Sequence, residues 1–289
     1  MSGKTLRFKQ VDVFTSVPFM GNPVAVVLEG DGLSGEQMQR IAGWTNLSET
    51  TFVLKPTQAG ADYRLRIFTP RAELPFAGHP TIGSAHAALE AGLVKPGRFR
   101  QECGAGVLEL SETGGKIEVK APKQVVTPLD AARTRELEGL LKAKVLSQPK
   151  VVNVGPIWIT AELDSSDALD KLVPDMQAIG AFADALGATG LNLFGATGKG
   201  QGGSPNGAAY HVRSFAPSHG VPEDPVCGSG NISVAAFLRD SDRLPGASYS
   251  TRQGMQLGRG GQVTIRIEAG EIFLGGHAVT CVEGTLRVQ

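Results

Sequence analysis

The chain has 289 residues, 41% of them hydrophobic, and its 28 Lys+Arg are balanced by 28 Asp+Glu. This length is sufficient for one large domain or for two domains that each bury a core. A net charge of zero removes the long-range attraction that draws basic proteins to nucleic acids or anionic membranes, so the expected partner is a small molecule or a second copy of the chain.

The cysteines indicate a reducing compartment. Cys103, Cys227 and Cys281 lie far apart without the spacing of metal ligands, and an odd number argues against a secreted disulfide framework. The first ten residues lack the apolar core of a signal peptide, and no run approaches the roughly 20 apolar residues of a membrane-spanning helix. We therefore expect a soluble, cytoplasmic protein with no metal site and no membrane or nucleic-acid partner.

Hydrophobic patterning predicts alternating strands and helices. Residues 34–44 are predicted to form a helix with Ser34 as its N-cap, and two more helices are expected over 80–91 and 131–141. Residues 124–128 are interpreted as a connector between two halves, 1–127 and 128–289, although terminal strands could cross between them. Short apolar or alternating runs predict strands at 7–14, 25–28, 51–54, 63–68, 106–110 and 116–119.

An internal repeat supports the division into halves. The segment Arg66-Ile-Phe-Thr-Pro70 is echoed by Arg213-Ser-Phe-Ala-Pro217, and each is followed by a Gly-containing turn that opens a helix of small residues. The second turn lies 150 residues after the first (228 minus 78), which pairs Gly78 with Gly228, Ile82 with Ile232 and Ala85 with Ala235. Duplication of such a unit predicts two similar halves that bury the same apolar face.

The two repeated helices carry almost no charge, so neither has a broad solvated face. We expect an α/β (α+β) fold of two pseudo-symmetric halves, each a curved, mostly antiparallel sheet or barrel around its own central helix. The helix starts at Gly78 and Gly228 would then offer backbone N–H groups and a partial positive charge to a carboxylate. The alternative is that these glycines serve only turn geometry.

Proton-handling side chains surround both helix starts. His79 follows Gly78, and Asp224 precedes the second helix in Pro222-Glu-Asp-Pro225, a sequence also typical of an ordinary turn. Cys227 could be an acid or base with a lowered pKa, or a buried inert thiol. Its counterpart in the repeat is Ala77, so a symmetric pair of thiols is absent. Glu49 by itself resembles any surface glutamate.

One apparent motif does not fit its usual function. The string Gly198-Lys-Gly-Gln-Gly-Gly203 matches the GxGxxG pattern. Dinucleotide binding requires a helix after this pattern, but here the sequence leads through Pro205 into a strand-like run. We interpret it as a flexible turn.

Nearly end to end, the sequence resembles the PhzF-like (phenazine-biosynthesis-like) isomerase family of the diaminopimelate-epimerase-like fold. The resemblance is carried by separated motifs in family order: Val11-Asp-Val-Phe14, Gly21-Asn-Pro-Val24, Asn46-Leu-Ser-Glu49, Phe76-Ala-Gly-His-Pro80, Glu223-Asp-Pro225, Gly228-Ser229 and Gly275-Gly276. It implies two halves with the active site between them, no cofactor, a small carboxylate-bearing substrate and a homodimer.

The resemblance also implies roles for individual residues. Glu49 would be the acid/base that removes and returns a proton. His79 and Asp224 would orient substrate and take part in proton transfer. Gly78 and Ser229 would contact substrate, with Gly228 and Cys227 beside them. Cys227 departs from the pattern, because PhzF-like sequences typically have a non-thiol residue there, whereas epimerase relatives have a cysteine there and at the position of Ala77.

Three functions remain open from the sequence. The first is proton-transfer isomerisation with Glu49 as general acid/base. The second is epimerisation at an α-carbon by Glu49 and Cys227, and the third is a small-carboxylate binding protein without catalysis.

Overall fold

Residues 4–198 and 207–288 are described by a computed structural model, in which the chain divides into unit 1 (residues 1–120 and 275–289) and unit 2 (residues 121–274). The boundary between the two units lies at residues 120 and 121, a few residues before the boundary predicted after residue 127. Residues 124–128, interpreted above as a connector, instead contain strand β9 (Val125–Pro128), which pairs antiparallel with β10 (Lys150–Asn153). The sequence interpretation was wrong there because Pro122 and Pro128 masked a short β-branched run.

Unit 1 is a barrel of eight strands, closed by pairing between the first and last strands of the chain. The pairs β2–β3 and β4–β6 are parallel, whereas β1–β17, β1–β2, β3–β4, β6–β7 and β7–β8 are antiparallel. In order around the barrel the strands are β1 (Lys4–Val13), β2 (Asn22–Val27), β3 (Thr50–Leu54), β4 (Tyr63–Phe68), β6 (Gly97–Cys103), β7 (Gly106–Thr113), β8 (Lys116–Lys120) and the later part of β17 (Glu271–Val288), with short β5 (Glu73–Leu74) beside β4.

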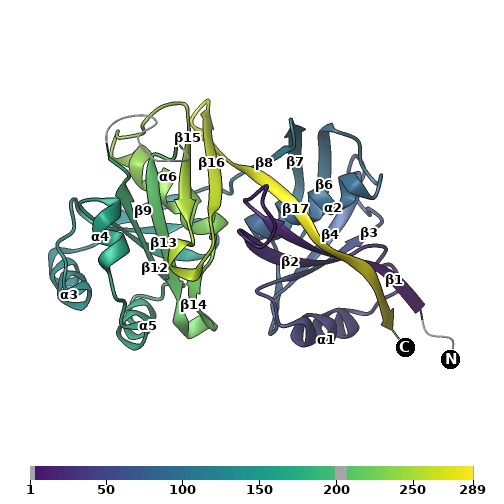
Figure 1. Cartoon of the computed structure of the whole chain (residues 1–289), viewed down its shortest axis with the longest axis horizontal. Coiled ribbons are helices and arrows are strands. Elements are labelled where there is room, and N and C mark those ends of the chain that lie inside the picture. The colour runs from purple at the N-terminus through teal and green to yellow at the C-terminus, as the bar shows by residue number, and fades with distance from the viewer. Residues whose placement is uncertain (1–3, 199–206, 289) are drawn as a thin grey trace. The chain divides into compact units, whose positions relative to one another are not determined.

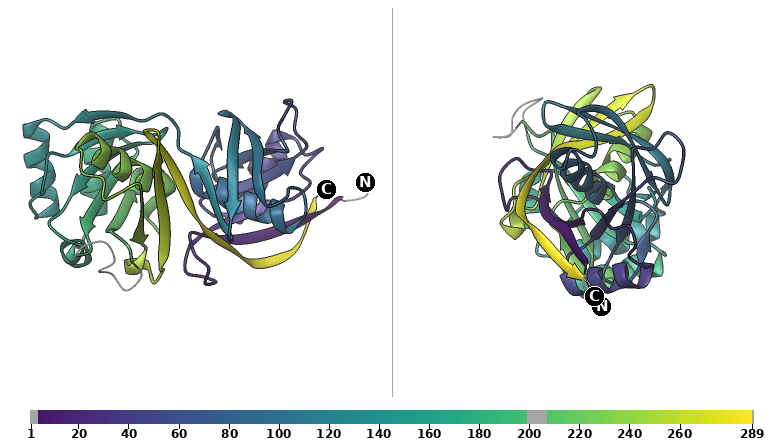
Figure 2. Two further views of the ribbon diagram at one scale, coloured as in Figure 1. Left: turned by 90° about the horizontal axis from the view of Figure 1, so that it is seen from above. Right: turned by 90° about the vertical axis from the view of Figure 1, so that its right-hand side faces the viewer.

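Strand β17 closes this barrel along most of its length. Its register with β1 runs from Lys4 opposite Val288 to Val13 opposite Ala278. Figure 1 and Figure 2 show the yellow end of β17 lying alongside purple β1.

Helix α2 (Gly78–Glu90) fills the barrel of unit 1, and nearly all of its residues are buried. Gly83 allows this close fit, since a Cβ there would lie 2.5 Å from Val24 Cγ1 and 2.8 Å from Val13 Cγ2. Helix α1 (Gly35–Thr45) packs outside, with Met38 and Ala42 buried. Its N-cap is Ser34, which forms a full capping box with Gln37 and confirms the predicted helix start.

Unit 2 repeats this plan with a curved sheet around helix α6 (Gly228–Asp240). The strands follow the order β9, β10, β11 (Ile157–Glu162), β12 (Gly190–Ala196), β13 (Tyr210–Ala216), β15 (Ser248–Gln253) and β16 (Gly261–Glu268), with β14 (Val221–Asp224) also paired to β13. The parallel pairs β11–β12 and β13–β15 correspond to β2–β3 and β4–β6 of unit 1.

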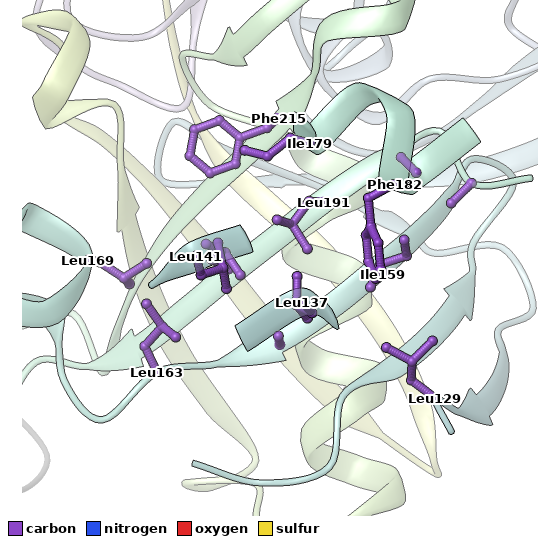
Figure 3. Close-up of a cluster of buried hydrophobic side chains, with 14 residues drawn as sticks. Leu129, Leu137, Leu141, Ile159, Leu163, Leu169, Ile179, Phe182, Leu191 and Phe215 are labelled. Carbon is purple, nitrogen blue, oxygen red and sulfur yellow. The ribbon is translucent and has the colours of Figure 1, made fainter. Parts of the chain in front are cut away.

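Three helices add a second apolar core on the outside of the unit 2 sheet, shown in Figure 3. Leu137, Ile179 and Leu191 are among its fully buried members. The covering helices are α3 (Ala131–Leu141), α4 (Ser166–Lys171) and α5 (Met176–Ala185), and two short 3₁₀ turns lie at η1 (Pro217–His219) and η2 (Met255–Leu257). Among the described residues, every helix is too short or too polar to cross a lipid bilayer.

The fold confirms the predicted duplication. Helices α2 and α6 both have 13 residues, begin 150 positions apart and are buried in their own sheets. The repeated arginines also have equivalent partners: Arg66 forms an ion pair with Glu73, and Arg213 forms one with Glu223. Each strongly curved sheet thus encloses a helix of small residues, as the composition of these helices predicted.

Candidate functional site

His79 and Glu49 meet in unit 1. His79 is the second residue of α2 and its side chain is 7% exposed, while Glu49 immediately precedes β3 and is 15% exposed. The distance from His79 Nε2 to Glu49 Oε2 is 3.4 Å. The structure therefore places these two predicted residues side by side, although the sequence separates them by a strand hairpin.

The His79 ring has a defined tautomer. It is hydrogen-bonded to the backbone of Pro23, which has only a carbonyl to offer, so the ring donates that bond. Among the described residues Nε2 has no hydrogen-bond partner, so the donor is Nδ1 and Nε2 carries a lone pair. Burial lowers the pKa of His79 to about 3, which keeps the ring neutral. A bare imidazole nitrogen thus faces the Glu49 carboxyl group.

The glycine-containing loop before β2 explains how Pro23 is held near His79. The Gly21 N–H donates to Asp12 Oδ2 at 2.8 Å, which ties the loop to β1. A Cβ on Gly21 would lie 2.2 Å from the Val13 carbonyl oxygen, so only glycine allows this approach. The hydrogen bond between Gly21 and Asp12 thus holds the start of β2, the strand that carries the Pro23 carbonyl to which His79 is hydrogen-bonded.

The start of α2 has no side-chain cap. Its N-cap residue, Ala77, forms no side-chain hydrogen bond, and Gly78 is buried as the first helical residue. The first N–H groups of a helix have no partner within the helix. This end of α2 can therefore accept an anionic group, which is the role predicted for Gly78.

In unit 2, Cys227 is the N-cap of α6. The Gly230 N–H donates to its Sγ at 3.2 Å, and the Ser229 Oγ lies 3.4 Å from the same sulfur. Burial, followed by the nearby Asp224 carboxylate, raises the pKa of the Cys227 thiol well above its usual range. The thiol is therefore neutral at physiological pH, and the lowered pKa considered from sequence does not occur.

Asp224 lies at the end of β14, just before this helix start. Burial raises its pKa to about 6, and hydrogen bonds from the Cys227 thiol and the Val226 N–H partly offset that effect. The carboxyl group thus titrates close to neutral pH, where both of its charge states are populated.

Two further residues hold this helix start, and sequence reasoning missed both. Gln253 accepts from the Cys227 N–H at 3.1 Å and donates to the Asp224 carbonyl at 3.0 Å, so one amide clamps both ends of the turn. Trp158 donates from Nε1 to Ser229 Oγ at 3.0 Å. Gln253 lies in Thr251-Arg-Gln-Gly254, which weakly echoes Gln101-Glu-Cys-Gly104 of the first half, and this echo was its available signal. Trp158 had no signal beyond its place in an apolar strand.

The structure thus forms two groups of predicted residues. Glu49, Gly78 and His79 lie together in unit 1. In unit 2, Asp224, Cys227, Gly228 and Ser229 lie around the start of α6. The GxGxxG string falls largely on residues 199–203, which lie outside the described residues.

Comparison with known proteins identifies the family of the chain. The family model "Phenazine biosynthesis-like protein" (PhzC-PhzF) matches residues 11–284. The chain is 40% identical to Antisense-enhancing sequence 1 of Schizosaccharomyces pombe, over 96% of this chain and 97% of that protein. It is 37% identical to the trans-2,3-dihydro-3-hydroxyanthranilate isomerase of Pseudomonas aeruginosa, over 96% and 98% of the two chains.

The fold is also that of a solved relative. The crystal structure of the Bacillus anthracis phenazine biosynthesis protein of the PhzF family superimposes with a TM-score of 0.84 at 25% identity, covering 98% of this chain and 99% of that one. The match of the family model over nearly the whole chain, together with these relatives, shows that the chain belongs to the phenazine biosynthesis-like (PhzC-PhzF) family and is an isomerase.

Proposed function

We propose that this isomerase moves a proton on a small carboxylate-bearing substrate, with Glu49 as the general acid/base. The observation that carries the proposal is the contact of Glu49 Oε2 with the bare Nε2 of His79 at 3.4 Å. A carboxyl group that must take a proton and later return it needs a partner that tolerates both of its charge states.

His79 meets that requirement. When Glu49 holds the proton, its O–H can donate to the Nε2 lone pair. When Glu49 is ionised, two lone pairs face each other, and that arrangement favours taking up a proton from substrate. The carbonyl of Pro23 prevents the ring from changing tautomer. The pair is thus suited to hold one mobile proton.

The residues of unit 2 supply orientation in this proposal. The start of α6 can bind the carboxylate through the backbone N–H groups of Gly228 and Ser229. Asp224 would orient the substrate or share its proton, consistent with its pKa of about 6. Cys227 serves as the N-cap of α6. Its raised pKa keeps it a neutral thiol at physiological pH, so almost no thiolate is present to act as a base.

The Pseudomonas relatives supply the first substrate to test, trans-2,3-dihydro-3-hydroxyanthranilate. Its name describes a ring with a carboxylate and conjugated double bonds, which acidify a neighbouring C–H. Wild-type protein incubated with this compound in D₂O should introduce deuterium at carbon, detectable by NMR. If it does not, amino and hydroxy acids should be screened in the same way.

The decisive variant is Glu49→Gln, which keeps the shape and removes the base. Deuterium incorporation should fall by on the order of 10² to 10⁴. Glu29→Gln is the matched control, since Glu29 is an exposed carboxylate of unit 1 paired with Arg7. Exchange by Glu49→Gln at the wild-type rate would refute the role of Glu49.

The Glu49–Cys227 epimerase is the alternative. It requires Cys227→Ser to reduce exchange as strongly as Glu49→Gln does, whereas the leading proposal expects a mild effect, because serine can still cap α6. A binding protein without catalysis would instead show ligand-induced thermal stabilisation and no exchange. The expected homodimer can be measured by light scattering.

A further inference from the structure

A chain of hydrogen bonds in unit 2 leads from Trp158 to Asp224. The Trp158 Nε1–H donates to Ser229 Oγ at 3.0 Å, and that oxygen lies 3.4 Å from Cys227 Sγ. The thiol is in turn hydrogen-bonded to the Asp224 carboxyl group. All four side chains lie on β11, on β14 or at the start of α6.

The chemistry of its two ends gives this chain one direction. An indole N–H can only donate, and an ionised carboxylate can only accept. Because the Cys227 S–H donates to Asp224, the sulfur can only accept from Ser229, so the serine hydroxyl donates to the sulfur. That arrangement leaves the serine oxygen to accept from Trp158, which is what the 3.0 Å distance shows.

We propose that Trp158 is a positioning residue whose indole N–H fixes the direction of this chain, so that the thiol proton of Cys227 points at Asp224. Without the indole N–H, the Ser229 hydroxyl loses the donor that fixes its rotation, so it can turn its O–H away from the sulfur and accept the thiol proton on oxygen. The chain would then reverse, and Asp224 would lose a donor. The role of Trp158 in turnover rests on the proposed function, whereas its effect on Asp224 does not.

Trp158 is held firmly enough for this role. It is 3% exposed, and a Cβ on Gly190 of the neighbouring strand would lie 2.9 Å from its ring. Two titratable groups lie near Asp224: Cys227 at the helix start and Glu223 on the same strand. Glu223 is neutralised by Arg213, with both nitrogen–oxygen distances at 2.9 Å. The charge of Glu223 is therefore balanced in every variant, and the double substitution below separates the hydrogen-bond chain from other effects on Asp224.

The test measures Asp224 directly in the full-length protein, without any ligand. With ¹³C-labelled aspartate, the carboxyl signal that Asp224→Asn removes is followed against pH. Trp158→Phe should raise the Asp224 pKa, lowering its acid dissociation constant by on the order of fivefold, the effect of one lost hydrogen bond. Trp44→Phe is the matched control, because Trp44 is 78% exposed in unit 1, and should leave the titration unchanged.

A double substitution distinguishes an effect of the hydrogen-bond chain on the Asp224 titration from an effect of packing. In a Cys227→Ala background the chain is broken, so Trp158→Phe should no longer move the Asp224 titration, whereas a cavity effect would persist. Cys227→Ser keeps a donor and an acceptor and should restore the dependence on Trp158.

Two measurements avoid loss of packing at Trp158. Benzothienylalanine incorporated for tryptophan in the Trp44→Phe protein keeps the ring shape without the N–H, and should raise the Asp224 pKa as Trp158→Phe does. In a ¹H–¹⁵N spectrum, Ser229→Ala should move the Trp158 indole signal upfield and leave that of Trp44 in place. An Asp224 titration that is unchanged by loss of the indole N–H, or an unmoved indole signal, would overturn the proposal.

Discussion

His79 is buried and Asp224 is half-buried, and the pKa values of both are shifted in ways that disfavour their charged forms. The neutral His79 ring has a pKa of about 3 and the Asp224 carboxyl group a pKa of about 6. The consequences for stability have opposite signs. The unfolded chain binds a proton more tightly than the folded chain at His79, and less tightly at Asp224.

His79 should make the protein sensitive to acid. Between pH 6.5 and 3 the unfolded state protonates this ring and the folded state does not, so stability is lost as the pH falls. By pH 4.5 the loss amounts to roughly 2 to 3 kcal/mol. His79→Asn should therefore lose less stability between pH 7 and 4.5 in urea titrations. His219→Asn, at an exposed site, should match wild type, and equal losses in all three proteins would contradict the assignment.

Asp224 should act in the other direction. Its raised pKa contributes stability below about pH 4, which disappears as the pH rises through 6. Going from pH 4.5 to 7.5 should cost the wild type roughly 2 kcal/mol that Asp224→Asn does not lose. The quantity to compare is the change in free energy of unfolding between the two pH values, because the absolute values also contain the hydrogen bond from Cys227. An Asn variant with the same pH dependence as wild type would exclude the raised pKa.

At the scale of elements, two helical glycines provide a matched pair. Gly83 in α2 packs against Val24 and Val13, whereas Gly139 in α3 has nothing within 4 Å of the position that a Cβ would take. Gly83→Ala should destabilise the protein by roughly 1 to 3 kcal/mol through overpacking, and Gly139→Ala should stabilise it by about 0.5 to 1 kcal/mol through helix propensity. Chemical denaturation measures both. A stabilising Gly83→Ala would mean that α2 does not fit its barrel closely.

Sequence patterns predicted the elements best where local and tertiary forces agree. The strand at residues 63–68 and the helix at 131–141 have the predicted bounds, because their apolar spacing matches the faces they bury. Strand β9 was missed because it lies exposed between prolines and is defined mainly by its pairing with β10. Helix α2 begins two residues earlier than predicted, at Gly78 instead of Pro80, because its start is set by the barrel around it.

At the scale of the molecule, the last strand completes the barrel of unit 1. Residues 278–288 of β17 pair with β1 over its whole length, and β17 also pairs with β8. Ending the chain after residue 276 would leave both strands with unpaired backbone groups. In ¹H–¹⁵N spectra the truncated protein should lose the dispersed signals of unit 1, including that of the His79 amide. Retention of those signals would show that the barrel does not depend on β17.

The sequence by itself determined the duplication, the two buried small-residue helices and the identity of the residues around their starts, because these depend on local composition and on motifs in fixed order. The tertiary structure decided which of those residues interact. Only folding brings Glu49 to His79, gives the ring its tautomer through the Pro23 carbonyl, and adds Trp158 and Gln253 to the start of α6. Burial, which raises the pKa of Cys227 and lowers that of His79, arises from the packing of residues distant in the chain, so no local pattern could have predicted it.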